Sequence, residues 1–127
     1  MPLILYHNAR CSKSRAAYDW LTSQSLPFET IDYLQNPPTL NTLRTLAAQL
    51  GCTSPRQMMR TADSLFTELG LDTADDEALF AALATHPQLL QRPIAVSGSR
   101  AVIGRPLAHL QQFIQEHYAE SATTFTN

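Results

Sequence analysis

The sequence predicts one α/β domain built as a three-layer sandwich, in which helices cover both faces of a four-stranded mixed sheet. Three observations support this prediction. A strand–helix–strand pattern opens the chain, a hairpin pattern and a final helix close it, and helical text over about residues 39–87 separates the two parts. This order of elements matches a thioredoxin-like sandwich with a helical insertion. We expect the single domain to span residues 1–119.

The first unit covers residues 3–33. Its opening run, residues 3–6, is continuously apolar, which is typical of a strand buried on both faces. Apolar residues then recur at helical spacing after Cys11. Residues 27–33 are rich in β-branched and aromatic side chains and predict a second strand. A strand, helix and strand in this order imply a right-handed crossover and a parallel strand pair.

The insertion begins after the proline-rich break "QNPPT". Leucines at helical spacing predict a helix over residues 40–50, with Thr39 as its N-cap and Gly51 at its end. Shorter helical patterns follow as far as Pro87, and the acidic start of the last one suits the positive end of a helix dipole.

The closing part of the domain contains a hairpin and a helix. Short apolar stretches at residues 93–96 and 101–104 flank "SGSR", which predicts a β-hairpin. Pro106 then opens a final amphipathic helix. Residues 120–127 are polar, and we expect them to form a frayed tail.

Composition excludes several classes of protein. The chain has 127 residues, 44% of them hydrophobic, and a net charge of −2, so no basic field favours nucleic acid. No apolar run approaches the roughly 20 residues of a membrane span, and the N-terminus does not resemble a signal peptide. Two cysteines outside C-x-x-C spacing and four scattered histidines predict neither a disulfide scaffold nor a metal site. We expect a cytoplasmic monomer with no bound cofactor.

The stretch "YHNARCSKSR" suggests a reactive thiol. Cys11 stands where the first strand gives way to a helix, and the unpaired N–H groups of a first helical turn stabilise an anion. Arg10, Lys13 and Arg15 add positive charge nearby, and the hydroxyl or N–H of Ser14 is within reach of the sulfur. Such surroundings lower a cysteine pKa and produce a nucleophile at neutral pH. Cys52 has no comparable surroundings and is interpreted as structural.

Other residues of the loop have a supporting role in this interpretation. Asn8 is suited to tether the loop by side-chain hydrogen bonds. His7 either orders the loop with its ring or acts as a base, and the first is favoured. Lys13 and Arg15 are equally compatible with solvated charges and with thiolate stabilisation.

Three arginines stand at positions suited to anion binding. Arg60 lies in the helical insertion, while Arg92 and Arg105 each precede a proline and therefore sit at element boundaries. The arginine fork matches tetrahedral oxyanions. A cis bond between Arg92 and Pro93 beside the cysteine loop would suit a thioredoxin-like frame. Taken singly, each arginine is also compatible with a solvated surface position.

Five blocks together resemble a known family, the glutaredoxin-coupled arsenate reductases. The blocks are "YHNARCSKSR", "YLQNPPT", "MMRTADSLFTELGL", "HPQLLQRPIAV" and "IGRP", and they cover about residues 3–118. The resemblance implies that Cys11 is the catalytic nucleophile. It also implies that Arg60, Arg92 and Arg105 bind a small oxyanion substrate.

The resemblance implies an external reductant as well. Ser14 stands where a C-x-x-C motif would have its second cysteine, so the electrons are expected from glutathione and then glutaredoxin. Two alternatives stay open: a general thiol oxidoreductase, and a redox-sensing regulator that binds RNA polymerase. Such regulators usually carry a C-x-x-C switch, which this chain lacks, so the enzyme is favoured.

Overall fold

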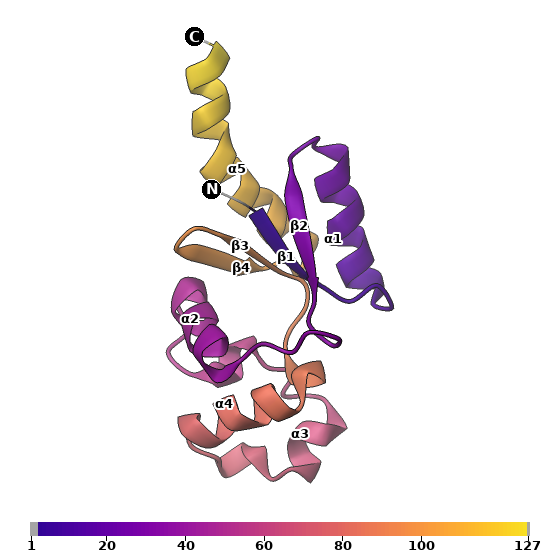
Figure 1. The fold of residues 1–127 in the computed structure, drawn as a ribbon, viewed down its shortest axis with the longest axis vertical. Helices are drawn as coiled ribbons and strands as arrows, with labels where there is room; N and C mark the ends of the chain where they lie inside the picture. The colour runs from indigo at the N-terminus through magenta and orange to yellow at the C-terminus, as the bar shows by residue number, and fades with distance from the viewer. Residues whose placement is uncertain (1–2, 127) are drawn as a thin grey trace.

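A four-stranded mixed sheet forms the centre of the molecule (Figure 1). The computed structural model describes residues 3–126, with side chains for residues 3–117. Its strands are β1 (Leu3–His7), β2 (Phe28–Asp32), β3 (Ile94–Ser97) and β4 (Arg100–Ile103), in the spatial order β2–β1–β3–β4. β1 pairs with β2 in parallel, and β3 is antiparallel to both β1 and β4. The predicted parallel pair, hairpin and mixed sheet are confirmed.

The α-helices are α1 (Ser12–Ser23), α2 (Leu40–Leu50), α3 (Ser64–Glu68), α4 (Asp76–Thr85) and α5 (Leu107–Thr126). Short 3-10 turns η1 (Pro55–Met58), η2 (Leu71–Thr73) and η3 (Pro87–Leu89) complete the insertion. The backbone of α5 continues to Thr126, through most of the segment expected to be a frayed tail, whose side chains lie outside the described residues. Within residues 3–126, no helix is long and apolar enough to cross a membrane.

Two hydrophobic cores lie on opposite faces of the sheet. Leu3, Leu5 and Ala95 pack on one face with buried residues of α1 and α5, namely Ala17, Leu21, Leu110, Phe113 and Ile114. Tyr6 and Ile94 pack on the other face with buried residues of α2 and α4, namely Leu43, Leu46, Leu79 and Leu83. Successive strand residues point to opposite faces, so β1 and β3 contribute to both cores. This arrangement produces the three predicted layers.

The strand register brings several chain segments to one end of the sheet. His7 of β1 is opposite Asp32 of β2, so these parallel strands stop together. Tyr6 is opposite Ile94, so the antiparallel β3 starts at the same end. Ile103 of β4 is also opposite Ile94, so β4 stops there too. We call this end, where β1, β2 and β4 stop and β3 starts, the carboxyl edge.

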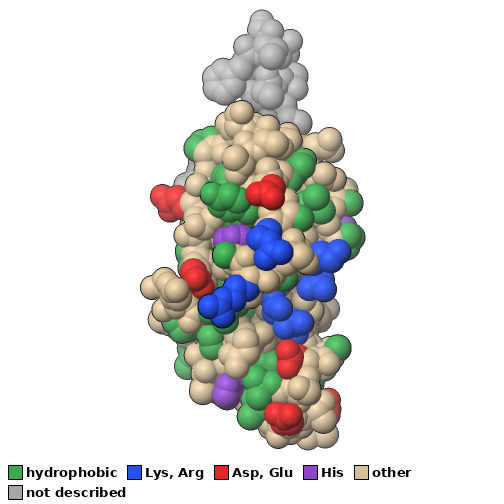
Figure 2. Space-filling model, turned by 90° about the vertical axis from the view of Figure 1, so that its right-hand side faces the viewer, with side chains coloured by type: hydrophobic (Ala, Val, Ile, Leu, Met, Phe, Trp, Pro, Cys, Tyr) green, Lys and Arg blue, Asp and Glu red, His purple; other side chains and the backbone are tan. Residues whose placement is uncertain are grey.

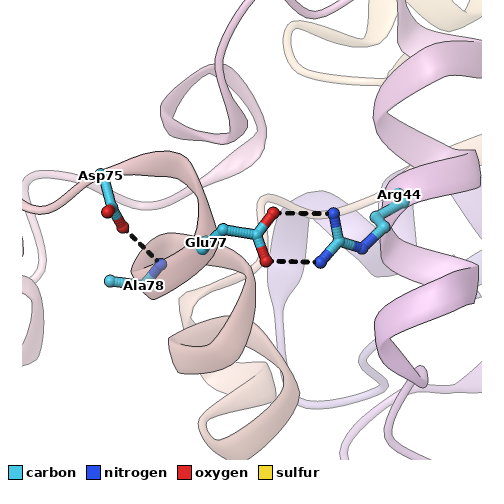
Figure 3. Close-up of polar contacts among 4 residues, drawn as sticks. All are labelled: Arg44, Asp75, Glu77 and Ala78. Carbon is cyan, nitrogen blue, oxygen red and sulfur yellow. Dashed lines mark hydrogen bonds and ion pairs between the residues drawn. The ribbon is translucent and has the colours of Figure 1, made fainter.

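Caps and one exposed ion pair organise the insertion (Figure 3). Asp75 caps α4 by accepting a hydrogen bond from the N–H of Ala78 at 2.9 Å. Arg44 of α2 donates two hydrogen bonds to the Glu77 carboxylate of α4, at 2.9 and 2.7 Å, and its guanidinium lies 5.2 Å from the centroid of the Phe80 ring. Exposed ion pairs contribute little to stability. The buried leucines of α2 and α4 therefore do most to hold the two helices together.

Gly51 offers a test of the predicted end of α2. Its φ is 72°, and a Cβ added there would have no heavy atom within 4 Å. The cost of Gly51→Ala therefore comes from the left-handed backbone alone, and we expect a loss of about 1 kcal/mol in the free energy of unfolding. Gly51→Asn should lose less, because asparagine tolerates this conformation better. Urea denaturation measures both, and an unchanged Gly51→Ala variant would contradict the assignment.

Candidate active site

Cys11 lies between the end of β1 and the first residue of α1. It is the N-cap of α1, with extended backbone angles. Its N–H donates to the Asn8 carbonyl at 3.0 Å, and its carbonyl accepts from the N–H of Arg15 at 2.9 Å. Hydrogen bonds from the backbone N–H groups of Ser14 and Lys13 reach the sulfur. The first turn of α1 thus supplies donors to a thiolate, as expected for a helix N-terminus.

The pKa of the Cys11 thiol is lowered below its ordinary value. Partial burial is the largest single influence and raises this pKa. It is outweighed by the N–H of Ser14, a hydrogen bond from the Arg92 side chain, the N–H of Lys13, and the charge of Arg92. Together, these groups favour the thiolate.

The source of the positive charge differs from the sequence interpretation. The side-chain charges of Arg10, Lys13 and Arg15 are not among the causes of the lowered pKa of Cys11. Arg15 instead donates to the carbonyl of Ala9 at 3.0 Å. The charge that acts on the sulfur comes from a residue far away in sequence, because the carboxyl edge brings the start of β3 beside the end of β1.

Ser14 orders the loop between β1 and α1 through hydrogen bonds. It is fully buried, and its hydroxyl oxygen accepts a hydrogen bond from the N–H of Asn8 at 3.0 Å. The same oxygen lies 2.6 Å from Nδ1 of His7. The Asn8 side chain accepts from the N–H of Arg10 at 3.0 Å. Ser14 therefore stabilises the thiolate with its N–H, while its hydroxyl fixes the loop.

His7 orders this loop in its neutral form. Burial is the largest cause of the lowered pKa of His7; Asp32 and Asp19 oppose the shift, and Arg15 adds to it. In the neutral ring that is protonated at Nε2, Nδ1 accepts the hydrogen of the Ser14 hydroxyl, whose oxygen also accepts from the Asn8 N–H. The ring also stacks on Tyr18, with 5.2 Å between centroids. These contacts fit the ordering role better than that of a base.

Arg92 is the arginine that reaches Cys11. Only Pro93 separates it from Ile94, which pairs with Tyr6, so it stands at the carboxyl edge close to the residues that follow β1. Its bond to Pro93 is cis, as the sequence suggested. Its side chain lies near enough to the Cys11 sulfur to lower the pKa of the thiol, both as a hydrogen-bonding group and through its charge.

Arg60 and Arg105 line a cleft of about 580 Å³. Asp63, Gln91 and His109 also line it. Arg60 forms an ion pair with Asp63 at 3.3 Å. Gln91, which directly precedes Arg92 in sequence, lines this cleft, whereas Arg92 itself does not. Figure 2 shows Lys and Arg side chains gathered across the middle of one face.

Backbone pairing explains how Arg60, from the insertion, comes near the sheet. Its N–H donates to the Leu89 carbonyl at 2.7 Å, and the N–H of Gln91 donates to the Met58 carbonyl at 2.8 Å. These bonds flank an isolated antiparallel bridge between Met59 and Leu90. The segment that carries Arg60 thus lies beside the segment leading to β3. All three arginines come to one region, with Arg92 at the sulfur and the other two in the cleft.

Four polar residues of this region were missed in the sequence: Tyr33, Asp63, Gln91 and His109. One signal was available for Tyr33. It directly follows β2, as Asn8 follows β1, and parallel strands end at a common edge. Asp63, Gln91 and His109 carried no such signal, because their positions depend on how the insertion and α5 pack.

Cys52 does not line the cleft of Arg60 and Arg105, but it lines a neighbouring pocket that shares Ile103 and His109 with that cleft. It is free and partly buried, and burial raises the pKa of its thiol. Among the described residues, no group of three or more His, Cys, Asp or Glu side chains is arranged to hold a metal ion.

The comparisons with known proteins agree with this geometry. A model of the ArsC family matches residues 6–113. The chain belongs to the ArsC family. This ArsC-family chain is 46% identical over 114 residues to a Neisseria meningitidis protein named arsenate reductase, covering 87% of this chain and 97% of that one. A Haemophilus influenzae protein of the same name is 42% identical over 108 residues, covering 84% and 93%.

A solved structure shares the fold. The structure titled arsenate reductase from Vibrio cholerae superposes with a TM-score of 0.82 at 41% identity, covering 87% of this chain and 97% of that one. The thioredoxin-like α/β fold predicted from the sequence is therefore confirmed.

The two cysteines should differ in reactivity. The pKa of Cys11 is lowered and that of Cys52 is raised, so the Cys11 thiolate should form at lower pH. We expect iodoacetamide to modify Cys11 first, with a pH midpoint below the ordinary value of about 8.5. Mass spectrometry of peptides after timed alkylation measures both rates. Equal rates with ordinary pH midpoints would argue against a reactive Cys11.

Proposed function

We propose that this ArsC-family protein is a thiol-dependent reductase of arsenate or a similar oxyanion, with Cys11 as the nucleophile. The observation that carries the proposal is the position of Cys11 at the N-terminus of α1, where the N–H groups of Ser14 and Lys13 and the side chain of Arg92 lower the pKa of its thiol. The names of the Neisseria and Haemophilus relatives support arsenate as the substrate.

The oxyanion binds beside the thiolate. Arg92, already at the sulfur, orients the anion for attack and neutralises part of its charge. Arg60 and Arg105 supply further charge from the cleft. Asp63 pairs with Arg60 in the absence of an anion, so the incoming oxyanion competes with this carboxylate. Bidentate arginine contacts give the site its preference for tetrahedral oxyanions.

The reaction then proceeds through a covalent adduct. The Cys11 thiolate attacks arsenic, an As–O bond breaks, and the leaving oxygen takes protons from solvent and departs as water. The sulfur–arsenic(V) adduct then needs two electrons to reach arsenic(III). Glutathione then forms a second sulfur–arsenic bond and displaces another oxygen, which departs as water. A glutaredoxin thiolate attacks the glutathione sulfur, the bond from that sulfur to arsenic breaks, and its electron pair reduces arsenic(V) to arsenic(III) while the two sulfur atoms are oxidised to a mixed disulfide. Hydrolysis of the remaining Cys11–arsenic bond releases arsenite and the Cys11 thiol.

The thiol that resolves the adduct is external in this proposal. Ser14 occupies the second position of a possible C-x-x-C motif, and its hydroxyl is committed to the loop. Cys52 does not line the cleft itself but a neighbouring pocket, and burial raises the pKa of its thiol. We therefore propose glutathione and glutaredoxin as the reductant and the protein partner.

Arginine substitutions test the oxyanion site in a coupled assay with arsenate, glutathione and glutaredoxin. A hydrogen bond to a charged group contributes about 1.5–3 kcal/mol, so Arg60→Ala, Arg92→Ala and Arg105→Ala should each lower kcat/KM about ten- to a hundredfold. Only Arg92→Ala should also raise the pKa of Cys11. Substitution of the same arginines by lysine should retain part of the activity, because lysine keeps the positive charge but lacks the planar guanidinium fork.

Arg44→Ala is the matched control for these variants. Arg44 is an exposed arginine of α2 that pairs with Glu77 of α4. It does not line the cleft, so kcat/KM of Arg44→Ala should stay unchanged. If all three site variants behave like Arg44→Ala, the proposed oxyanion site is ruled out. A parallel assay with a disulfide substrate separates the alternatives, since a faster reaction there than with arsenate would favour a general thiol oxidoreductase.

Cys52→Ser tests the external reductant. Because Cys52 is free and its thiol pKa is raised, we expect kcat to stay within about twofold of the unmodified protein. The coupled assay and a thermal melt are measured on the same preparation. A folded variant without turnover would mean that an internal disulfide belongs to the cycle, contrary to the proposal.

A further inference from the structure

Tyr33 carries a buried hydroxyl with no hydrogen-bond partner. The residue directly follows β2 and is fully buried in the core on the α2 and α4 face of the sheet. Its hydroxyl oxygen has no partner among the described residues. Buried polar groups are nearly always paired, because burial without a partner costs free energy. An unpaired hydroxyl at the carboxyl edge therefore requires an explanation.

A second unpaired atom lies on the neighbouring Arg92. Its Nε is also buried without a partner in the described part of the chain. Burial, the largest influence, raises the pKa of Tyr33; the charge of Arg92 and the hydrogen-bonding side chains of Asn8 and Arg92 lower it, and the charge of Cys11 raises it. The Arg92 side chain is thus near this hydroxyl, although among the described residues no contact of full hydrogen-bond geometry joins the two unpaired atoms. Arg92 and Cys11 are thus the ionisable groups that act on this hydroxyl. An N–H donor and an oxygen acceptor stand close together, both unused, beside the reactive sulfur.

The strand register explains why these groups meet. Asn8 and Cys11 follow β1, Tyr33 follows β2, and Arg92 precedes β3, so all four arrive at the carboxyl edge. The raised pKa keeps the Tyr33 hydroxyl neutral at physiological pH. A neutral hydroxyl keeps its lone pairs available to an arginine N–H without adding a negative charge beside the thiolate.

We propose that Tyr33 is a positioning residue for the oxyanion site, whose buried hydroxyl accepts a hydrogen bond from Arg92 when an oxyanion occupies the site. The oxyanion binds the terminal nitrogens of the Arg92 guanidinium, and the Tyr33 hydroxyl accepts a hydrogen bond from Nε. The two unpaired atoms satisfy each other only in the occupied site, so their pairing contributes to anion affinity. This inference rests on the proposed function, because it assigns Tyr33 to the same site.

The test is Tyr33→Phe, which removes a single buried oxygen. The probe is inorganic phosphate or arsenate, measured by the concentration that protects Cys11 from iodoacetamide. One lost hydrogen bond corresponds to about a two- to tenfold weaker protection, and KM for arsenate should rise by the same factor with kcat retained. The melting temperature should stay the same or rise, since an unpaired buried oxygen has been removed.

Two controls separate positioning from a structural role. Tyr6→Phe changes another buried tyrosine, which packs beneath α2, and should leave phosphate protection unchanged. In an Arg92→Ala background, Tyr33→Phe should have no further effect, because the two residues act through one bond. Equal protection in Tyr33→Phe and the unmodified protein, or an undiminished effect in the Arg92→Ala background, would overturn the role of Tyr33.

The outcomes also separate this inference from the proposed function. If neither phosphate nor arsenate protects Cys11 in the unmodified protein, the oxyanion site itself fails and Tyr33 has no site to organise. If the unmodified protein is protected and Tyr33→Phe is protected equally, only the role of Tyr33 fails. A lower melting temperature together with unchanged protection would make Tyr33 a core residue alone.

Discussion

The strand register at the carboxyl edge is the constraint on which the site depends. Because β1 and β2 are parallel and β3 runs against them, the residues after β1 and β2 meet the residues before β3. β4 returns Arg105 to the same end. A slip of one residue in the pairing of β1 and β3 would turn their side chains to the wrong faces and move Arg92 away from Cys11. The two hydrophobic cores that hold this register therefore also hold the catalytic geometry.

Opposing influences act on the Cys11 thiol. Burial alone would keep it protonated, and this is the largest single influence on its pKa. Several donors aimed at the sulfur outweigh it: two backbone N–H groups from the first turn of α1 and the Arg92 side chain. The loop before Cys11 is ordered as well, because the buried Ser14 hydroxyl hydrogen-bonds to the Asn8 N–H and to the His7 ring. The thiolate thus depends on preorganised donors rather than on the basic residues beside it in sequence.

Among the described residues, the proposed oxyanion site is incompletely hydrogen-bonded. Arg60 is paired with Asp63, whereas Arg92 and Tyr33 each keep an unpaired buried atom. Groups that hydrogen-bond fully in the empty site would have to give up those bonds when substrate arrives. In the proposed function, keeping such groups available is a form of preorganisation, in which some stability of the fold is exchanged for affinity toward the oxyanion.

The sequence by itself determined the α/β sandwich, the hairpin and the helix N-terminus at Cys11, and it singled out the three arginines that we propose as anion ligands. Those features follow from local periodicity, turn residues and a family resemblance, all of which are written in short stretches of chain. Tertiary structure decided which positive charge acts on Cys11, and it divided the arginines between the sulfur and the cleft. It also placed Tyr33 near the site. Backbone hydrogen bonds joined the segment that contains Arg60 to the residues that precede β3. Such contacts join residues tens of positions apart, and strand register and packing, rather than local sequence, determine them.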